Sequence, residues 1–145
     1  MGDVDFLILD LPPGTGDIQL TIVQTAELDG VVVVTTPQEV ALIDARKAIG
    51  LFERVETPIL GIIENMSYFQ CPSDGKIYHI FGEGGGEREA AKLGVPLLGK
   101  IPLDISTRFG GDEGRPVALE DPGQNPVSAA FRQVAEQCAR VVLDR

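Results

Sequence analysis

Four short apolar runs place the strongest limit on what this chain can fold into. They cover residues 6–9, 31–35, 59–63 and 97–101. Each run is almost continuous in Val, Ile, Leu or Phe, which is typical of parallel strands buried on both faces. Helical patterns lie at about residues 17–27, 36–52, 87–93 and 126–143. The alternation predicts an α/β fold, a three-layer, mostly parallel open sheet with helices on both faces.

Local signals indicate where these helices begin. Asp17 is expected to cap the first helix, and Thr36 the second, with Pro37 at its first position. The last helix carries an apolar stripe that includes Cys138, which we expect to be a small buried residue. The Gly-rich tract at 82–87 does not follow a predicted strand, so we interpret it as a flexible lead into the third helix.

Charge and length limit the class of protein. The 145 residues fit one domain, and 22 acidic against 12 basic side chains give a net charge of -10. That charge argues against binding to nucleic acid or to an anionic membrane. No apolar run approaches the roughly 20 residues that span a bilayer, and the N-terminus lacks a signal-peptide pattern. We expect a soluble, cytoplasmic protein, and its two cysteines are too few for a disulfide framework.

The segment DLPPGTGD, residues 10–17, follows the first apolar run. Ligands of open α/β sheets bind beyond the carboxyl ends of the strands. A carboxylate at Asp10 can hold Mg²⁺ beside nucleotide phosphates. Gly14 and Gly16 allow the backbone to approach a γ-phosphate, and Asp17 either orients a water or caps the helix. The alternative is an acid at a strand end followed by an ordinary turn.

Several motifs together resemble one family. They are DLPPGTGD (10–17), VVVVTTPQEVALIDARKAI (31–49), GIIENMSYFQCP (61–72), GKIYHIFGEGGGE (75–87) and LLGKIPLD (97–104). In this order they resemble the Mrp-type (ApbC) iron–sulphur carrier ATPases, a branch of the deviant P-loop NTPases. The resemblance implies ATP, Mg²⁺ and an iron–sulphur cluster as ligands, a homodimer, and apo iron–sulphur proteins as clients.

The resemblance also implies roles for individual residues. Asp10 matches the Mg²⁺-associated acid and Gly14 the segment that senses γ-phosphate, so Asp10, Gly14 and Asp17 form the candidate catalytic set. Asn65 matches an asparagine that hydrogen-bonds adenine; its amide offers a donor and an acceptor. Pro102 and Asp104 match a loop beside the adenine. Turn or strand-end roles remain alternatives for Asn65, Pro102 and Asp104.

Cys71 is the candidate cluster ligand. The family has Cys-Pro-x-Cys in the irregular loop at 67–86, whereas here Asp74 replaces the second cysteine. Thiolates suit iron because they are soft donors. A symmetric dimer would supply two thiolates from this loop, whereas a cluster held by cysteines alone needs four. An ordinary loop thiol is the alternative for Cys71. His79, the single histidine, is expected to have a surface role.

No Gly-x-x-x-x-Gly-Lys-Ser/Thr segment occurs in the chain. In the family this P-loop precedes the DLPPGTGD segment, so we expect residues 1–145 to be the C-terminal part of a P-loop NTPase, an incomplete form of that fold. Without its neighbour, strand 6–9 is expected to pair with 31–35 or with another molecule. The expected function is an ATP-binding cluster carrier or assembly protein. The alternatives are a metal-free, partitioning-type switch ATPase, or a fragment inactive on its own.

Overall fold

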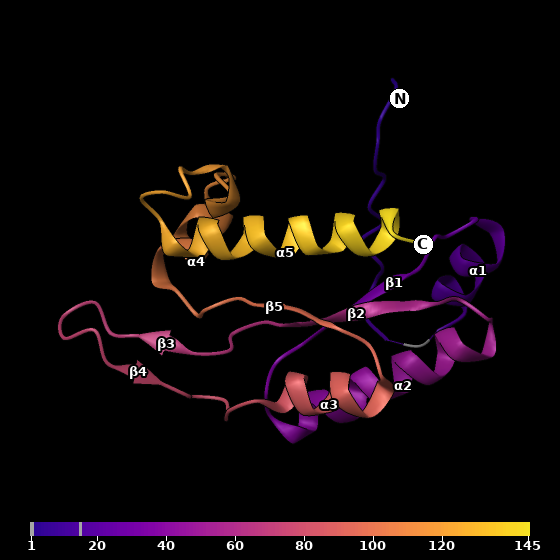
Figure 1. Cartoon of the computed structure of the whole chain (residues 1–145), viewed down its shortest axis with the longest axis horizontal. Helices are drawn as coiled ribbons and strands as arrows, with labels where there is room; N and C mark the ends of the chain where they lie inside the picture. Colours follow the sequence, from indigo (N-terminus) through magenta and orange to yellow (C-terminus); the bar gives the residue numbers. More distant parts are fainter. Residues whose placement is uncertain (1, 15) are drawn as a thin grey trace.

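The computed structural model describes residues 2–14 and 16–145. Its elements run in the order α1 (Asp17–Thr25), β1 (Val31–Thr35), α2 (Glu39–Arg54), β2 (Ile59–Glu64), β3 (Phe69–Gln70), β4 (Ile77–Tyr78), α3 (Gly85–Leu93), β5 (Leu97–Lys100), α4 (Ile105–Asp112), a 3₁₀ turn (Val117–Leu119) and α5 (Pro126–Leu143) (Figure 1). No helix within the described ranges is long and apolar enough to cross a membrane.

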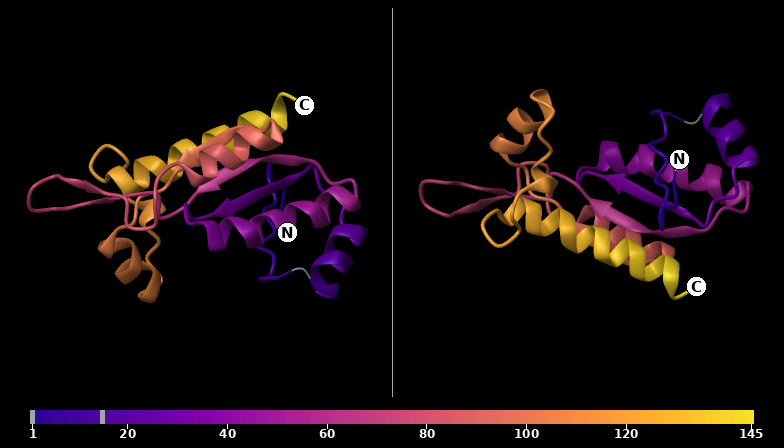
Figure 2. Two further views of the ribbon diagram at one scale, coloured as in Figure 1. Left: turned by 90° about the horizontal axis from the view of Figure 1, so that it is seen from below. Right: turned by 90° about the horizontal axis from the view of Figure 1, so that it is seen from above.

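A parallel sheet with the strand order β1-β2-β5 forms the middle layer. Helices α2 and α3 cover one face and α5 covers the other (Figures 1 and 2). The three-layer α/β architecture expected from the apolar runs is therefore confirmed. The β3–β4 hairpin is a separate antiparallel pair that extends beyond the end of the sheet.

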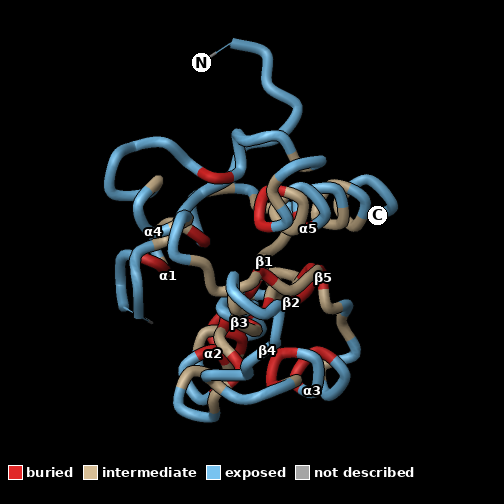
Figure 3. Tube along the Cα trace, turned by 90° about the vertical axis from the view of Figure 1, so that its left-hand side faces the viewer, coloured by how far each residue is buried: buried red, intermediate tan, exposed pale blue. Residues whose placement is uncertain are grey.

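The core lies mainly between the sheet and the α2–α3 layer. Ile62 on β2 is fully buried and belongs to a cluster with Val33, Ala45, Ile49 and Ala90. Figure 3 shows that buried residues concentrate in the sheet, α2 and α3. On the other face α5 packs closely, because a Cβ built on Gly99 would lie 2.5 Å from Val134 Cγ2.

The prediction of a strand at residues 6–9 is wrong. The segment has no strand structure, and Phe6 and Ile8 are 46% and 87% exposed. A strand needs a hydrogen-bonding neighbour, and within the described residues β1 pairs with β2 alone. The predicted pairing of 6–9 with 31–35 in the same chain is therefore also wrong.

Two predicted caps differ from the structure. Gly16 is the N-cap of α1 and makes no side-chain cap hydrogen bond, so Asp17 lies in the first turn. Helix α2 begins at Glu39 with Gln38 as N-cap, which leaves Thr36 and Pro37 outside the helix. An acid in a first turn still interacts favourably with the helix dipole. Helix α5 begins at Pro126 as predicted, capped by the Asn125 side chain.

Candidate functional site

The segments that follow β2 and β5 are hydrogen-bonded to each other. The Ile101 N–H donates to Glu64 O at 2.9 Å, and the Ser67 N–H donates to Ile101 O at 2.9 Å. Farther along, the Leu103 N–H donates to Tyr68 O at 2.7 Å. These bonds hold two loops together at the carboxyl end of the sheet, where α/β proteins bind ligands. Asn65, Pro102 and Asp104 are all on these loops.

Asn65 is half-buried, and its backbone N–H donates to Thr35 O at 2.7 Å. Its side-chain amide makes no hydrogen bond to any other residue that the structure describes. The next residue, Met66, has a positive φ of 50°, which is strained for a residue with a side chain. The turn therefore presents an amide whose donor and acceptor are both available to a ligand.

Asp104 is the N-cap of α4, a helix that the sequence analysis missed. Its Oδ2 accepts from the Thr107 N–H at 2.8 Å and from the Ser106 hydroxyl. Burial raises the pKa of Asp104, but hydrogen bonds donated by Ser106 and Thr107 outweigh this and hold the pKa below its usual value. A structural role is thus evident for Asp104, whereas Pro102 is a half-buried loop residue.

A shallow groove of about 240 Å³ lies between the hairpin and α4. Phe69 and Leu103, which form a bridge, lie at its base. The lining is otherwise Ile80, Asp104, Ile105 and Arg108. The groove is adjacent to the loop of Pro102 and is mostly apolar, as a surface for a flat ring would be.

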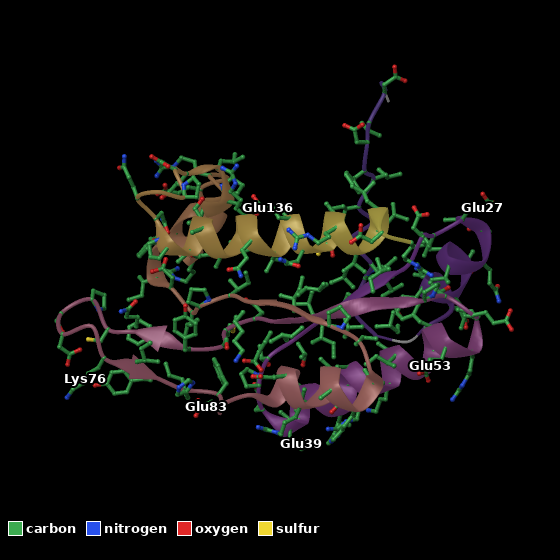
Figure 4. The ribbon with its side chains drawn as sticks, viewed as in Figure 1. Glu27, Glu39, Glu53, Lys76, Glu83 and Glu136 are labelled. Atoms are coloured by element: carbon green, nitrogen blue, oxygen red, sulfur yellow. The ribbon has the colours of Figure 1, made fainter. Side chains whose placement is uncertain are left out.

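Cys71 lies directly after β3, on the hairpin that occupies most of the loop predicted to be irregular. The backbone of Cys71 closes the turn, since its N–H donates to Lys76 O at 2.8 Å. Its Sγ lies 3.1 Å from Ser73 Oγ, and hydrogen bonds from the Ser73 side chain and backbone lower the pKa of Cys71, against an opposing effect of the Asp74 side chain. Lys76 near the hairpin tip projects away from the sheet (Figure 4).

The Asp74 carboxylate stabilises the hairpin turn, because its Oδ1 accepts from the Lys76 N–H at 3.0 Å. His79 Nε2 lies 3.7 Å from a Glu83 carboxylate oxygen, on the exposed surface. Across residues 2–14 and 16–145, no group of three or more His, Cys, Asp or Glu side chains could hold a metal ion. Cys138 is half-buried in α5, and burial raises its pKa.

The DLPPGTGD segment lies elsewhere. Asp10 and Asp17 are exposed, and Gly14 has a φ of 102°; Thr15 lies outside the described residues. The buried Gln19 of α1 donates from Nε2 to Pro12 O. Figures 1 and 2 show this segment toward α1, at the opposite end of the molecule from the hairpin. The structure therefore brings Asn65, Pro102 and Asp104 together near the base of the Cys71 hairpin, and does not bring Asp10 beside them.

Sequence reasoning missed a buried carboxylate, Glu64. It ends β2 and is 1% exposed. It accepts hydrogen bonds from the Ser67 hydroxyl and from the Gly86 N–H at 2.6 Å. The available signal was an acid directly after an apolar run, followed downstream by consecutive glycines. The glycine tract is accordingly a close-packed joint at 85–86, and its interpretation as a flexible lead is wrong there.

Two solved structures share this architecture. The nucleotide-binding protein of Archaeoglobus fulgidus, described as a complex with ADP, has a TM-score of 0.70 and 44% identity, over 79% of this chain and 47% of its own. The cell division ATPase MinD of Pyrococcus furiosus has a TM-score of 0.71 and 26% identity, over 94% of this chain and 52% of its own. The fold is therefore that of the P-loop NTPases.

Sequence comparison then gives the family. Residues 1–139 match the family model described as ParA, NUBPL iron-transfer P-loop NTPase, and the chain belongs to that family. The iron–sulphur cluster carrier protein of Pyrococcus furiosus is 51% identical over 136 residues, which are 94% of this chain and 45% of the relative. The resemblance to the Mrp-type carriers is confirmed. The chain spans about half the length of this curated relative.

Proposed function

We propose that this chain is part of an ATP-binding iron–sulphur cluster carrier, in which the nucleotide state is coupled to holding or transferring the cluster. One observation carries the proposal: the hydrogen bonds between residues 64–68 and 101–103 hold both the Asn65 turn and the base of the Cys71 hairpin against the loop of Pro102. The candidate adenine contact and a half-buried thiol of lowered pKa thus lie on one hydrogen-bonded junction. The names of the relatives support the same class of function.

In the proposal Asn65 hydrogen-bonds the adenine edge, and the loop of Pro102 and Asp104 lies beside the ring. Asp10 and Asp17 carry exposed carboxylates, and hard oxygen donors fit Mg²⁺. Asp10 would hold this ion, whose charge would neutralise the nucleotide phosphates. This role requires residues 10–14 to lie closer to the Asn65 turn than in this structure, where they lie toward α1. Gly14 would sense the γ-phosphate, and Asp17 would orient a water.

The cluster is cargo in this proposal. Two copies of the chain would each contribute the Cys71 thiolate, and apo iron–sulphur proteins would receive the cluster. Further ligands would come from Asp74 or His79, from small thiols or from a partner. A carrier that works through free thiolates needs a reducing compartment, so the proposal places the protein in the cytoplasm.

A metal-free, partitioning-type switch or scaffold ATPase is the second candidate. The single thiol of the hairpin favours it, because the second cysteine of the family pattern is replaced by Asp74. The chain lacks a Gly-x-x-x-x-Gly-Lys-Ser/Thr segment, so we expect the 145 residues alone to be inactive in ATP hydrolysis. Hydrolysis by a longer protein remains part of the proposal.

Anaerobic reconstitution tests cluster binding. The chain is incubated with iron, sulphide and a small thiol, desalted, and analysed for iron, acid-labile sulphide and visible absorption. We expect loading in the unmodified chain and in Cys138→Ser, and its loss in Cys71→Ser. Equal loading of Cys71→Ser and the unmodified chain would reject this loop as the carrier site. No loading of any variant would favour the metal-free switch.

A further inference from the structure

The Glu64 carboxylate is buried, yet its hydrogen bonds are supplied from within the chain. Oε1 accepts from the Ser67 hydroxyl, and Oε2 accepts from the Gly86 N–H at 2.6 Å. Burying a carboxylate is costly unless donors compensate for lost hydration. Gly86 lies in the first turn of α3, where N–H groups have no partner inside the helix and the dipole favours a negative charge.

The two donors stand at opposite ends of one segment. Ser67 precedes β3, and Gly86 follows β4 in the first turn of α3, so both ends of the hairpin segment converge on one side chain. Ser67 is also held through its N–H to Ile101 O. Beyond this closed base the β3–β4 hairpin, which contains Cys71, extends away from the sheet (Figure 2).

The glycines permit this closure. A Cβ on Gly86 would lie 3.0 Å from both Cβ and Oε2 of Glu64. A Cβ on Gly85 would lie 2.1 Å from Pro37 O. The start of α3 is therefore pressed against the end of β2 and against the chain before α2. Movement of the Glu64 backbone would be transmitted to α3 through a short contact rather than absorbed by a gap.

Asn65, the candidate nucleotide contact, directly follows Glu64 in the sequence. Asn65 and Met66 form the turn between Glu64 and Ser67, and the positive φ of Met66 places strain there. Strained residues persist where surrounding contacts hold them, and here the Glu64–Ser67 hydrogen bond closes the turn. The geometry thus joins the turn and both ends of the hairpin in one buried junction.

We propose that Glu64 is a positioning residue that couples the Asn65 turn to the Cys71 hairpin, so that nucleotide bound at Asn65 changes the exposure of the thiol. This inference rests on the proposed function, because it takes Asn65 as the nucleotide contact and Cys71 as the cluster ligand. Glu64 touches neither ligand and acts through Ser67 and Gly86.

The test uses the chain with Cys138→Ala, so that Cys71 is its single thiol. The alkylation rate of Cys71 by iodoacetamide is measured with and without saturating Mg-ADP. We expect the two rates to differ several-fold, and the ratio to approach one in Glu64→Gln and in Ser67→Ala. Ser67→Ala removes one of the two hydrogen bonds and keeps the test valid if Glu64→Gln fails to fold.

Hydrogen exchange adds a local readout. Amides of residues 69–78 should lose about tenfold or more of their protection in Ser67→Ala, as for loss of a hydrogen bond to a charged group, while β1 and β2 amides keep theirs. Glu83→Gln is the matched control, since its carboxylate belongs to the same segment but is 76% exposed. It should leave the protection and the rate ratio unchanged.

The inference is overturned if the alkylation ratio is one in the parent chain, or if it survives in both Glu64→Gln and Ser67→Ala. Either result leaves iron and sulphide loading intact if the proposed function is right. The opposite result is a parent chain that takes up no iron and sulphide but whose Cys71 alkylation rate still depends on Mg-ADP through Glu64. That result rejects cluster carriage and keeps the coupling.

Discussion

The close contact of Gly85 with the chain before α2 predicts that one added methyl group, in Gly85→Ala, strongly destabilises the fold. An alanine Cβ would lie 2.1 Å from Pro37 O and 2.8 Å from the Pro37 carbonyl carbon. Carbon and oxygen approach to about 3.3 Å at closest, so the helix must move by about 1 Å. Both neighbours are backbone atoms, and no side-chain rotation can relieve the contact.

Such a movement shifts Gly86 relative to Glu64 and disturbs the hydrogen bond between them. Overpacking costs about 1–3 kcal/mol, and losing a hydrogen bond to a charged group costs about 1.5–3 kcal/mol. The better helix propensity of alanine offsets about 1 kcal/mol. We therefore expect Gly85→Ala to lower the free energy of unfolding by about 1.5–5 kcal/mol.

Urea unfolding followed by circular dichroism measures this, with the midpoints compared at equal m-values. Gly50→Ala is the matched control. Gly50 is in the interior of α2 with no atom within 4 Å of a Cβ, and the substitution should stabilise by about 0.5–1 kcal/mol. A Gly85→Ala protein within about 0.5 kcal/mol of the parent would refute the close-packed joint.

Three further predictions follow from individual contacts. Glu89 accepts two hydrogen bonds from Arg46, which hold the pKa of Glu89 below its usual 4.5. This stabilisation is present above about pH 4.5 and is lost as the pH falls through the lowered pKa. The urea midpoints of Glu89→Gln and the parent should therefore differ at pH 7 and approach each other as the pH is lowered below 4.5. Ser73→Ala should raise the pKa of Cys71 and slow its alkylation at pH 7; an unchanged pH–rate profile would contradict the hydrogen bond. Asp104→Ala should cost about 1 kcal/mol in urea unfolding through loss of the helix cap, and an unchanged midpoint would argue against that cap.

The sequence was sufficient where local signals decide the structure. The continuous apolar runs at 31–35, 59–63 and 97–101 became the parallel strands within one residue at each end, because burial on both faces demands such runs. Helix α5 begins at Pro126, where the fixed φ of proline suits a first turn. The motif order also led to the correct family.

Long-range contacts explain the errors. Residues 6–9 have a strand-like sequence, but a strand forms only beside a neighbour, and apolarity alone does not supply one. The glycine tract is packed because of Pro37 and Glu64, which are distant in sequence. Asn65 and Asp104 lie on loops that follow two neighbouring parallel strands, whereas Asp10 follows a segment that pairs with no strand in the described residues.

Nuclear magnetic resonance titration with Mg-ADP tests most directly the central claim that the Asn65 turn and the loop of Asp104 form an adenine site beside the Cys71 hairpin. The account predicts saturable shifts of the Asn65 side-chain amide and of the backbone amides of Ile101, Leu103 and Asp104, and Asn65→Ala abolishes the shifts of these backbone amides. Saturable shifts confined to other elements, or binding of equal affinity in Asn65→Ala, would contradict it.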